Sequence, residues 1–158
     1  MIDKKKFYIN GEWIDAKGKE SIKVIDPSTE KSCAEISLGN KDDVNNAVIA
    51  AKKAYESWGF SSKEERIKLL ENLYVLYKKR WADIASAITM EMGAPKDFAT
   101  KLQAGTGASH IKSFIRYLKE FEFEKPLGEH APDQRIIYEP KGVCALITPW
   151  NWPMNQVC

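Results

Sequence analysis

The pattern of polar and apolar positions near the N-terminus predicts two β-hairpins. Residues 7–14 are divided by Asn10-Gly11, a pair typical of two-residue hairpin turns because both positions tolerate a positive φ. Residues 21–36 alternate on either side of an Asp-Pro-Ser-Thr turn at 26–29, with proline at its second position. We expect both hairpins to serve packing rather than chemistry.

Apolar residues then recur at helical spacing and predict a first helix over residues 41–58. Asn40 is a favourable N-cap, and Gly59 ends the helix. The apolar stripe that should pack against the rest of the molecule consists of Val44, Ala47, Val48, Ala51, Ala54, Tyr55 and Trp58. The stripe therefore predicts an amphipathic helix with one buried face.

A second helical segment follows directly. Ser62 and Glu65 match the capping-box pattern, in which each side chain bonds the backbone N–H of the other residue. The apolar stripe changes phase near Arg80, which predicts a break or bend there. Gly93 is the expected C-cap.

A third predicted helix has Pro95 in its first turn and runs to about Phe121. Its expected buried face comprises Phe98, Leu102, Ile111, Phe114, Ile115 and Leu118. Gly105 and Gly107 lie inside it, where each costs ~1 kcal/mol relative to alanine, so close packing against another element is expected. Gly-Thr-Gly is not a nucleotide loop, because no strand precedes it. His110 is expected to be a surface or hydrogen-bonded histidine.

The C-terminal part combines strand and loop signals. Residues 122–134 predict a surface connection, and residues 135–139 predict a strand. Residues 143–147 form an unbroken apolar run bounded by glycine and proline, which is typical of a buried parallel strand. The run leads into Thr-Pro-Trp-Asn-Trp-Pro, and Pro153 can open a helix. Ligands bind at the carboxyl ends of parallel strands, so this loop is the candidate site.

Composition narrows the function classes. The chain has 158 residues, of which 44% are hydrophobic and 29% charged, with a net charge of +2. These values are typical of a globular protein, and the interspersed charges predict no nucleic-acid partner. No apolar run approaches the ~18 residues of a membrane span, and the charged N-terminus is unlike a signal peptide. Three widely spaced cysteines predict neither disulfides nor a metal site, so a cytoplasmic location is expected.

Several segments, in order and spacing, resemble the NAD(P)-dependent aldehyde dehydrogenase superfamily, and together they cover essentially the whole chain. They are residues 7–13 (F-Y-I-N-G-E-W), 26–30 (D-P-S-T-E), 91–95 (E-M-G-A-P), 139–143 (E-P-K-G-V) and 147–153 (I-T-P-W-N-W-P). The last motif is the most specific of the five.

The resemblance implies an α/β fold: the N-terminal part of an aldehyde dehydrogenase, with hairpins and helices leading into a Rossmann-like cofactor domain. Residues 1–122 would be the N-terminal hairpins and helices of that domain. Residues 123–142 would form a connection and part of an oligomerisation ribbon, as in a homodimer or homotetramer. Residues 143–158 would supply the first strand, the P-W-N loop and the start of a helix.

The resemblance also implies a chemistry. The family oxidises a small aldehyde to a carboxylic acid with NAD or NADP, through a cysteine thiohemiacetal and a thioester. The Asn151 amide would face the oxyanion, and Trp152 would line the substrate channel. The cofactor would be lined, largely through backbone, by Ile147, Thr148, Pro149 and Trp150.

The family's nucleophilic cysteine and general-base glutamate lie downstream of the P-W-N motif, so this chain is expected to be inactive alone. Cys33 falls in a predicted hairpin strand, Cys144 is expected to be a buried inert thiol, and Cys158 lies in the C-terminal helix. None matches the context of the family's nucleophile.

Alternatives remain for the residues and for the function. Asn151 could instead cap the helix that begins at Pro153, while Trp150 and Trp152 could be core aromatics. His110 could face a substrate channel. The chain could also belong to a CoA-acylating or semialdehyde dehydrogenase, or to a non-catalytic scaffold protein built on the same fold.

Overall fold

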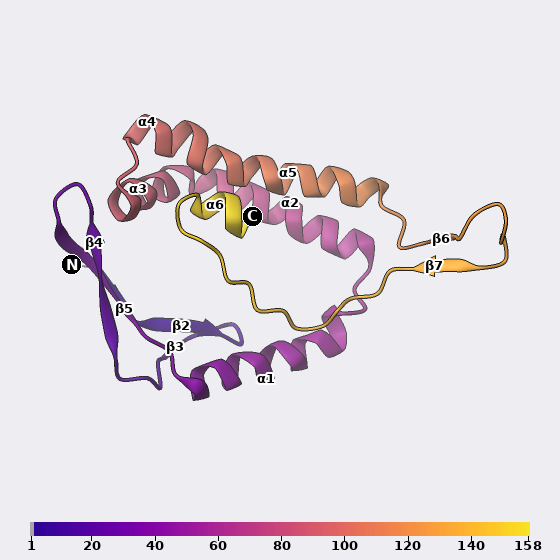
Figure 1. Ribbon diagram of the computed structural model, residues 1–158, viewed down its shortest axis with the longest axis horizontal. Helices are drawn as coiled ribbons and strands as arrows, with labels where there is room; N and C mark the ends of the chain where they lie inside the picture. Colours follow the sequence, from indigo (N-terminus) through magenta and orange to yellow (C-terminus); the bar gives the residue numbers. More distant parts are fainter. Residues whose placement is uncertain (1) are drawn as a thin grey trace.

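The computed structural model describes residues 2–158 and contains three small sheets and a set of long helices (Figure 1). The strands are β1 (Ile2–Lys4), β2 (Lys6–Ile9), β3 (Glu12–Asp15), β4 (Ser21–Asp26), β5 (Lys31–Ser37), β6 (Glu124–Pro126) and β7 (Arg135–Ile137). The helices are α1 (Lys41–Trp58), α2 (Lys63–Lys79), α3 (Trp81–Met92), α4 (Lys96–Phe98), the π-helical turn η1 (Ala99–Gln103), α5 (Ala104–Glu120) and α6 (Pro153–Val157).

Both predicted hairpins are confirmed. β2 and β3 pair antiparallel around Asn10 and Gly11, whose φ angles are 54° and 81°. β4 and β5 pair antiparallel, with a register shift between Val24 and Ile25. Sequence analysis missed β1, which adds to β5 in parallel and gives the sheet order β1-β5-β4. The Lys5 ammonium contacts the Glu35 carboxylate at 3.0 Å beside this added strand.

The start of α1 is the capping structure that the sequence predicts. The Asn40 side chain accepts hydrogen bonds from the backbone N–H groups of Asp42 and Asp43, at 2.9 and 3.1 Å. In return, the Asp43 carboxylate accepts from the backbone N–H of Asn40 at 3.0 Å. It also accepts from the N–H groups of Lys17 and Gly18, at 2.8 and 3.0 Å. The buried carboxylate therefore ties the β3–β4 connection to the helix.

We predict that Asp43 makes stability depend on pH. Its backbone donors, first that of Lys17, lower the pKa of Asp43 below its ordinary value. Because the folded pKa is the lower one, the stabilisation is present above the unfolded pKa and is lost as pH falls through the folded pKa. Asp43→Asn should lower the urea midpoint at neutral pH and flatten its acid dependence. Asp42→Asn, which removes a neighbouring exposed charge, should change the midpoint much less.

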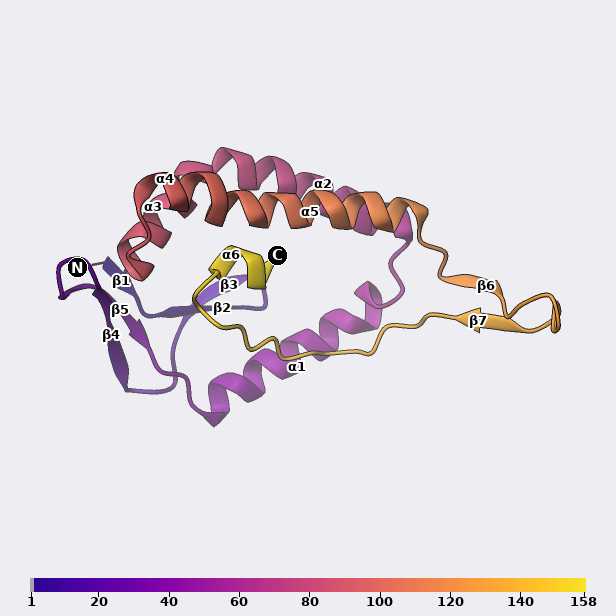
Figure 2. The ribbon, with the colours of Figure 1, turned by 45° about the horizontal axis from the view of Figure 1, so that its top comes forward.

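The helices that follow form the largest packed unit. α2 and the continuous helix α4-η1-α5 lie side by side and run in opposite directions (Figures 1 and 2). The capping box at Ser62 and the left-handed C-cap at Gly93 are as predicted, and the bend at Arg80 separates α2 from α3. The core consists of two clusters whose buried members are Tyr77, Ala85, Ile88, Ala94, Ala99, Ala104, Ala108 and Ile111.

The predicted buried face of the third helix is wrong at two positions. Leu102 and Phe114 are 52% and 59% exposed, whereas Gln103, one residue after Leu102, is buried. At Leu102 the reason is η1, which inserts an extra residue into one helical turn. Apolar periodicity assumes a constant 3.6 residues per turn, so it misplaces the residue inside the π turn. Beyond that turn, the predicted positions 111, 115 and 118 are buried or half-buried as expected.

Close packing at the two helix glycines is confirmed for one and not for the other. A methyl group on Gly107 would lie 2.5 Å from the Tyr77 hydroxyl and 2.9 Å from Met154 Cβ. A methyl group on Gly105 would meet only Trp81, at 3.9 Å. Gly107 therefore lies where Tyr77 of α2 and Met154 of α6 pack closely against α5. Burial raises the pKa of Tyr77 to about 12, and its hydroxyl donates to the Ala104 carbonyl at 2.8 Å.

The C-terminal segment differs most from the prediction. β7 pairs with β6 in an antiparallel hairpin that projects from one end of the molecule (Figure 1), so the predicted surface connection contains a strand. The buried strand predicted over residues 143–147 is not formed. This stretch is extended and exposed, and Leu146 is 84% exposed. A parallel strand needs neighbouring strands for its backbone hydrogen bonds and helices over its two faces, and no strand within residues 2–158 pairs with this stretch.

The described part of the chain exposes far more surface than a compact protein. Its accessible surface is 12136 Å², against about 8,000 Å² expected for a folded monomer of this mass. The apolar stripe of α1 contributes to the excess, because Val44, Val48 and Trp58 are exposed instead of packed. No helix within residues 2–158 combines the length and apolar character needed to cross a bilayer.

Candidate functional site

The candidate loop lies in the open. Ile147 and Trp150 are 94% and 86% exposed, and Thr148, Pro149 and Asn151 are exposed as well. Trp150 is thus not a core aromatic. Among the described residues, the backbone groups of residues 143–150 make no hydrogen bond, so their donors and acceptors are unpaired within residues 2–158.

Asn151 is not the cap of the helix that follows. The N-cap of α6 is Trp152, and no side chain bonds to the free N–H groups at that end. Nor does the Asn151 side chain bond to any other residue within 2–158. The capping alternative is therefore wrong, and the amide of Asn151 is available to a ligand.

The helix after the loop is docked on α5. Met154 packs against both core clusters and lies beside Gly107. The His110 ring Nε2 and the Asn155 Oδ1 are 2.7 Å apart, between α5 and α6. This contact confirms the expectation of a hydrogen-bonded histidine at His110.

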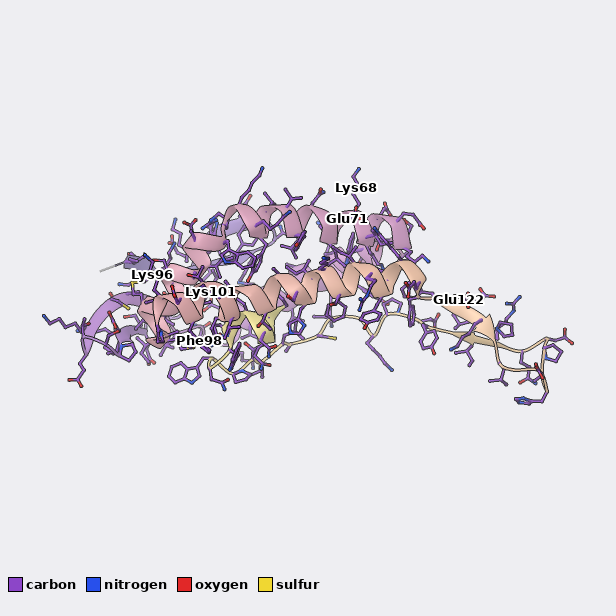
Figure 3. All side chains as sticks on the ribbon, turned by 90° about the horizontal axis from the view of Figure 1, so that it is seen from above. Lys68, Glu71, Lys96, Phe98, Lys101 and Glu122 are labelled. Atoms are coloured by element: carbon purple, nitrogen blue, oxygen red, sulfur yellow. The ribbon has the colours of Figure 1, made fainter. Side chains whose placement is uncertain are left out.

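Two more contacts hold the loop itself to the same long helix. The Trp152 ring meets Phe98 edge-on, with ring centroids 5.5 Å apart. Phe98 projects toward the side of the helix on which the C-terminal segment runs (Figure 3). The Gln103 side chain donates from Nε2 to the Asn151 carbonyl at 3.3 Å. Sequence analysis missed Gln103; a glutamine inside a Gly- and Ala-rich helical stretch was its only local signal, and its burial is visible only in the structure.

The three cysteines are scattered. Cys144 is exposed, which corrects the expectation of a buried thiol, because the strand that would bury it is not formed. Cys33 lies in β5, and its thiol contacts the Val24 carbonyl at 3.4 Å. Burial raises the pKa of Cys158, which disfavours the reactive thiolate. The described residues contain no group of three or more His, Cys, Asp or Glu side chains placed to hold a metal ion.

Two cavities in the described part of the chain are separate from the loop. One of about 790 Å³ lies between the β4–β5 turn and the helices α2, α3 and α4, and a second of about 510 Å³ lies between α2 and α5. No residue of 147–152 lines either cavity. The candidate site is therefore an exposed surface, in which Asn151 and the loop before it are accessible beside the long helix.

The comparison with known protein families decides what this arrangement belongs to. The sequence model of the aldehyde dehydrogenase family matches residues 13–158. The chain belongs to the aldehyde dehydrogenase family. The resemblance carried by the sequence motifs is thus confirmed, and so is the mixed α/β fold, which matches the N-terminal region of aldehyde dehydrogenase structures.

Individual relatives agree with the family match. The chain is 44% identical over 158 residues to 3-succinoylsemialdehyde-pyridine dehydrogenase of Pseudomonas sp., covering 99% of this chain and 32% of that protein. It superposes on an aldehyde dehydrogenase from Bartonella henselae with a TM-score of 0.97 and 50% identity, covering 99% of this chain and 33% of the other.

A second solved structure has bound ligands. An aldehyde dehydrogenase C mutant from Pseudomonas syringae, in complex with NAD+ and octanal, superposes with a TM-score of 0.91 and 37% identity. The match covers 97% of this chain and 31% of that one. This aldehyde dehydrogenase chain therefore spans about a third of the length of the relatives that it matches.

Proposed function

We propose that this chain forms part of an enzyme that oxidises an aldehyde to a carboxylic acid with NAD or NADP. The observation that carries the proposal is the P-W-N loop. Its Asn151 amide is exposed, bonds to no other described residue and is held at the surface by contacts to the long helix. The nucleophilic cysteine and the general base would come from segments outside this sequence.

Asn151 is suited to stabilise an oxyanion. Attack of a thiolate on an aldehyde carbon places negative charge on the carbonyl oxygen as the tetrahedral centre forms. The Asn151 Nδ2–H group can donate to that oxygen, and a neutral amide stays a donor at every working pH. A donor that is positioned before the reaction stabilises the developing charge without reorganisation. Trp152 would offer an apolar wall to the substrate next to this donor.

The residues before Asn151 fit a cofactor that is held through backbone groups. Ile147, Thr148, Pro149 and Trp150 are exposed, and their backbone groups bond to no described residue. When bound, the nicotinamide accepts a hydride from the substrate carbon. Bound NAD+ in the Pseudomonas syringae relative is consistent with this assignment.

The β6–β7 hairpin is proposed as part of an oligomerisation ribbon in a homodimer or homotetramer. It projects from the end of α5, and within residues 2–158 its two short strands pair only with each other. The free edge of such a hairpin can pair with a strand of a second subunit.

Within the family, a semialdehyde dehydrogenase is the second candidate, because the 44% identical relative from Pseudomonas sp. bears that name. The full-length protein should form reduced nicotinamide when it is mixed with NAD or NADP and an aldehyde. A panel of simple aldehydes, semialdehydes and aldehydes with added coenzyme A separates the candidates by their rates. Absence of reduced nicotinamide with every substrate would favour the scaffold function instead.

A further inference from the structure

The Asn151 loop is held by something other than its own helix. α6 spans only Pro153–Val157, and its N-terminus has no side-chain cap. Residues 143–150 form no strand and make no backbone hydrogen bond within the described part of the chain. Asn151 must nevertheless be fixed, because oxyanion stabilisation requires a donor within about 2.7–3.1 Å of the developing charge.

Gln103 is the residue that contacts the Asn151 backbone. Its side chain is 1% exposed, the least accessible of the large side chains. Its Nε2 donates to the Asn151 carbonyl at 3.3 Å, across 48 positions of the sequence. The reverse orientation of the amide would set two oxygens against each other, so this hydrogen bond also fixes how the amide is turned.

Burial of the Gln103 amide lowers the stability of the fold, which a residue with a purely structural role would avoid. Its Oε1 is buried and has no hydrogen-bond partner among residues 2–158. Burying an unpaired polar atom destabilises a fold by about 1–3 kcal/mol, and an apolar side chain of similar size would avoid this cost. The hydrogen bond that the amide does make goes to the loop and not to its own helix.

The π turn places Gln103 in line with the other residues that hold the segment. In a regular α-helix, residues five apart, such as Phe98 and Gln103, would point about 140° apart. The extra residue in η1 brings Gln103 back toward the face of Phe98. His110 lies seven residues beyond Gln103, within about 20° of the same face. One face thereby contacts Trp152, the Asn151 carbonyl and Asn155 in order.

We propose that Gln103 is a positioning residue for Asn151: from the π turn it fixes the Asn151 carbonyl and so aims the side-chain amide at the oxyanion. This inference rests on the proposed function. It assigns Gln103 no contact with substrate or cofactor, so its effect on catalysis must pass through Asn151.

A double-mutant cycle in the full-length enzyme tests this dependence. Gln103→Met keeps the side-chain volume and removes the hydrogen bond; it should lower kcat by about tenfold, since small misplacements of a catalytic group are that costly. In an Asn151→Ala background the same substitution should lower kcat by less than twofold, because the group that it positions is gone. Gln103→Leu, which is also uncharged and lacks the donor, provides a second variant if Gln103→Met does not fold.

Tyr77→Phe is the matched control. It removes a buried hydrogen bond to the same long helix, from the Tyr77 hydroxyl to the Ala104 carbonyl, without touching Asn151. It should leave kcat within about twofold of the parent, since no catalytic group is displaced. Crystal structures of the Gln103 variants should show the Asn151 carbonyl turned or displaced.

The positioning role and the proposed function can fail separately. If Gln103→Met lowers kcat equally in the parent and in the Asn151→Ala background, or lowers it in neither, the positioning role is overturned while the proposed function stands. An inactive parent enzyme, or an Asn151→Ala variant with full activity, would overturn the proposed function and the positioning role together.

Discussion

Replacement of Asn151 by alanine is expected to lower kcat of the full-length enzyme by about 10²–10³-fold, the usual loss for one oxyanion donor. The Asn151 amide is exposed and bonds to no described residue, while the backbone carbonyl of the same residue accepts a hydrogen bond from Gln103. Its removal should therefore leave the fold intact. Because the interaction strengthens only as charge develops on oxygen, the loss should be in kcat rather than in cofactor affinity.

Asn151→Asp sharpens the test. It keeps the size of the side chain but replaces the N–H donor by a carboxylate, which repels an oxyanion, so the loss should be at least as large. Steady-state kinetics gives kcat, and nicotinamide fluorescence gives the dissociation constant of the cofactor. A kcat within twofold of the parent for Asn151→Ala would rule out the oxyanion role.

The second large effect is expected from a single methyl group at Gly107. Alanine there would press on the Tyr77 hydroxyl at 2.5 Å and on Met154 Cβ at 2.9 Å. Overpacking of this kind typically costs about 1–3 kcal/mol, which exceeds the ~0.5–1 kcal/mol that alanine gains over glycine within a helix. Because Met154 belongs to α6, the strain should also displace the segment that carries Asn151.

Gly105→Ala is the matched control on the same helix. The nearest atom to the added methyl group, on Trp81, lies at 3.9 Å, an ordinary van der Waals distance. Only the higher helix propensity of alanine over glycine then changes the stability, so this variant should be stabilised by up to ~1 kcal/mol. Urea unfolding measures both free energies, and shifts of the same sign for the two glycines would contradict the packing argument.

Much of the local structure could be predicted because its causes are local. The turn at Asn10, the capping box at Ser62 and the left-handed cap at Gly93 each depend on a few adjacent residues, and all are found where expected. The position of Asn151 after a Thr-Pro-Trp run could be identified in the same way, as part of a motif read along the chain.

Features that depend on distant residues could not be predicted. The parallel pairing of β1 with β5 joins residues about thirty positions apart, and no local pattern announces it. The run at 143–147 has the composition of a buried strand, yet it stays exposed because no partner strand is present among the described residues. Composition indicates what a segment can do, whereas burial depends on which neighbours lie beside it.

The long helix α4-η1-α5 shows most clearly which features follow from local sequence and which depend on distant residues. Its existence and its start at Pro95 follow from residue types alone, whereas the role proposed for Asn151 follows from the resemblance of its motif to a known family. The side chain that it buries at the π turn does not follow from residue types, because the extra residue there places Gln103 in the interior in place of Leu102. A hydrogen bond from that interior position to the Asn151 carbonyl exists only after the chain has folded back across the helix. The sequence motif therefore points to Asn151 as the proposed oxyanion donor, and three-dimensional packing determines which residue contacts its backbone.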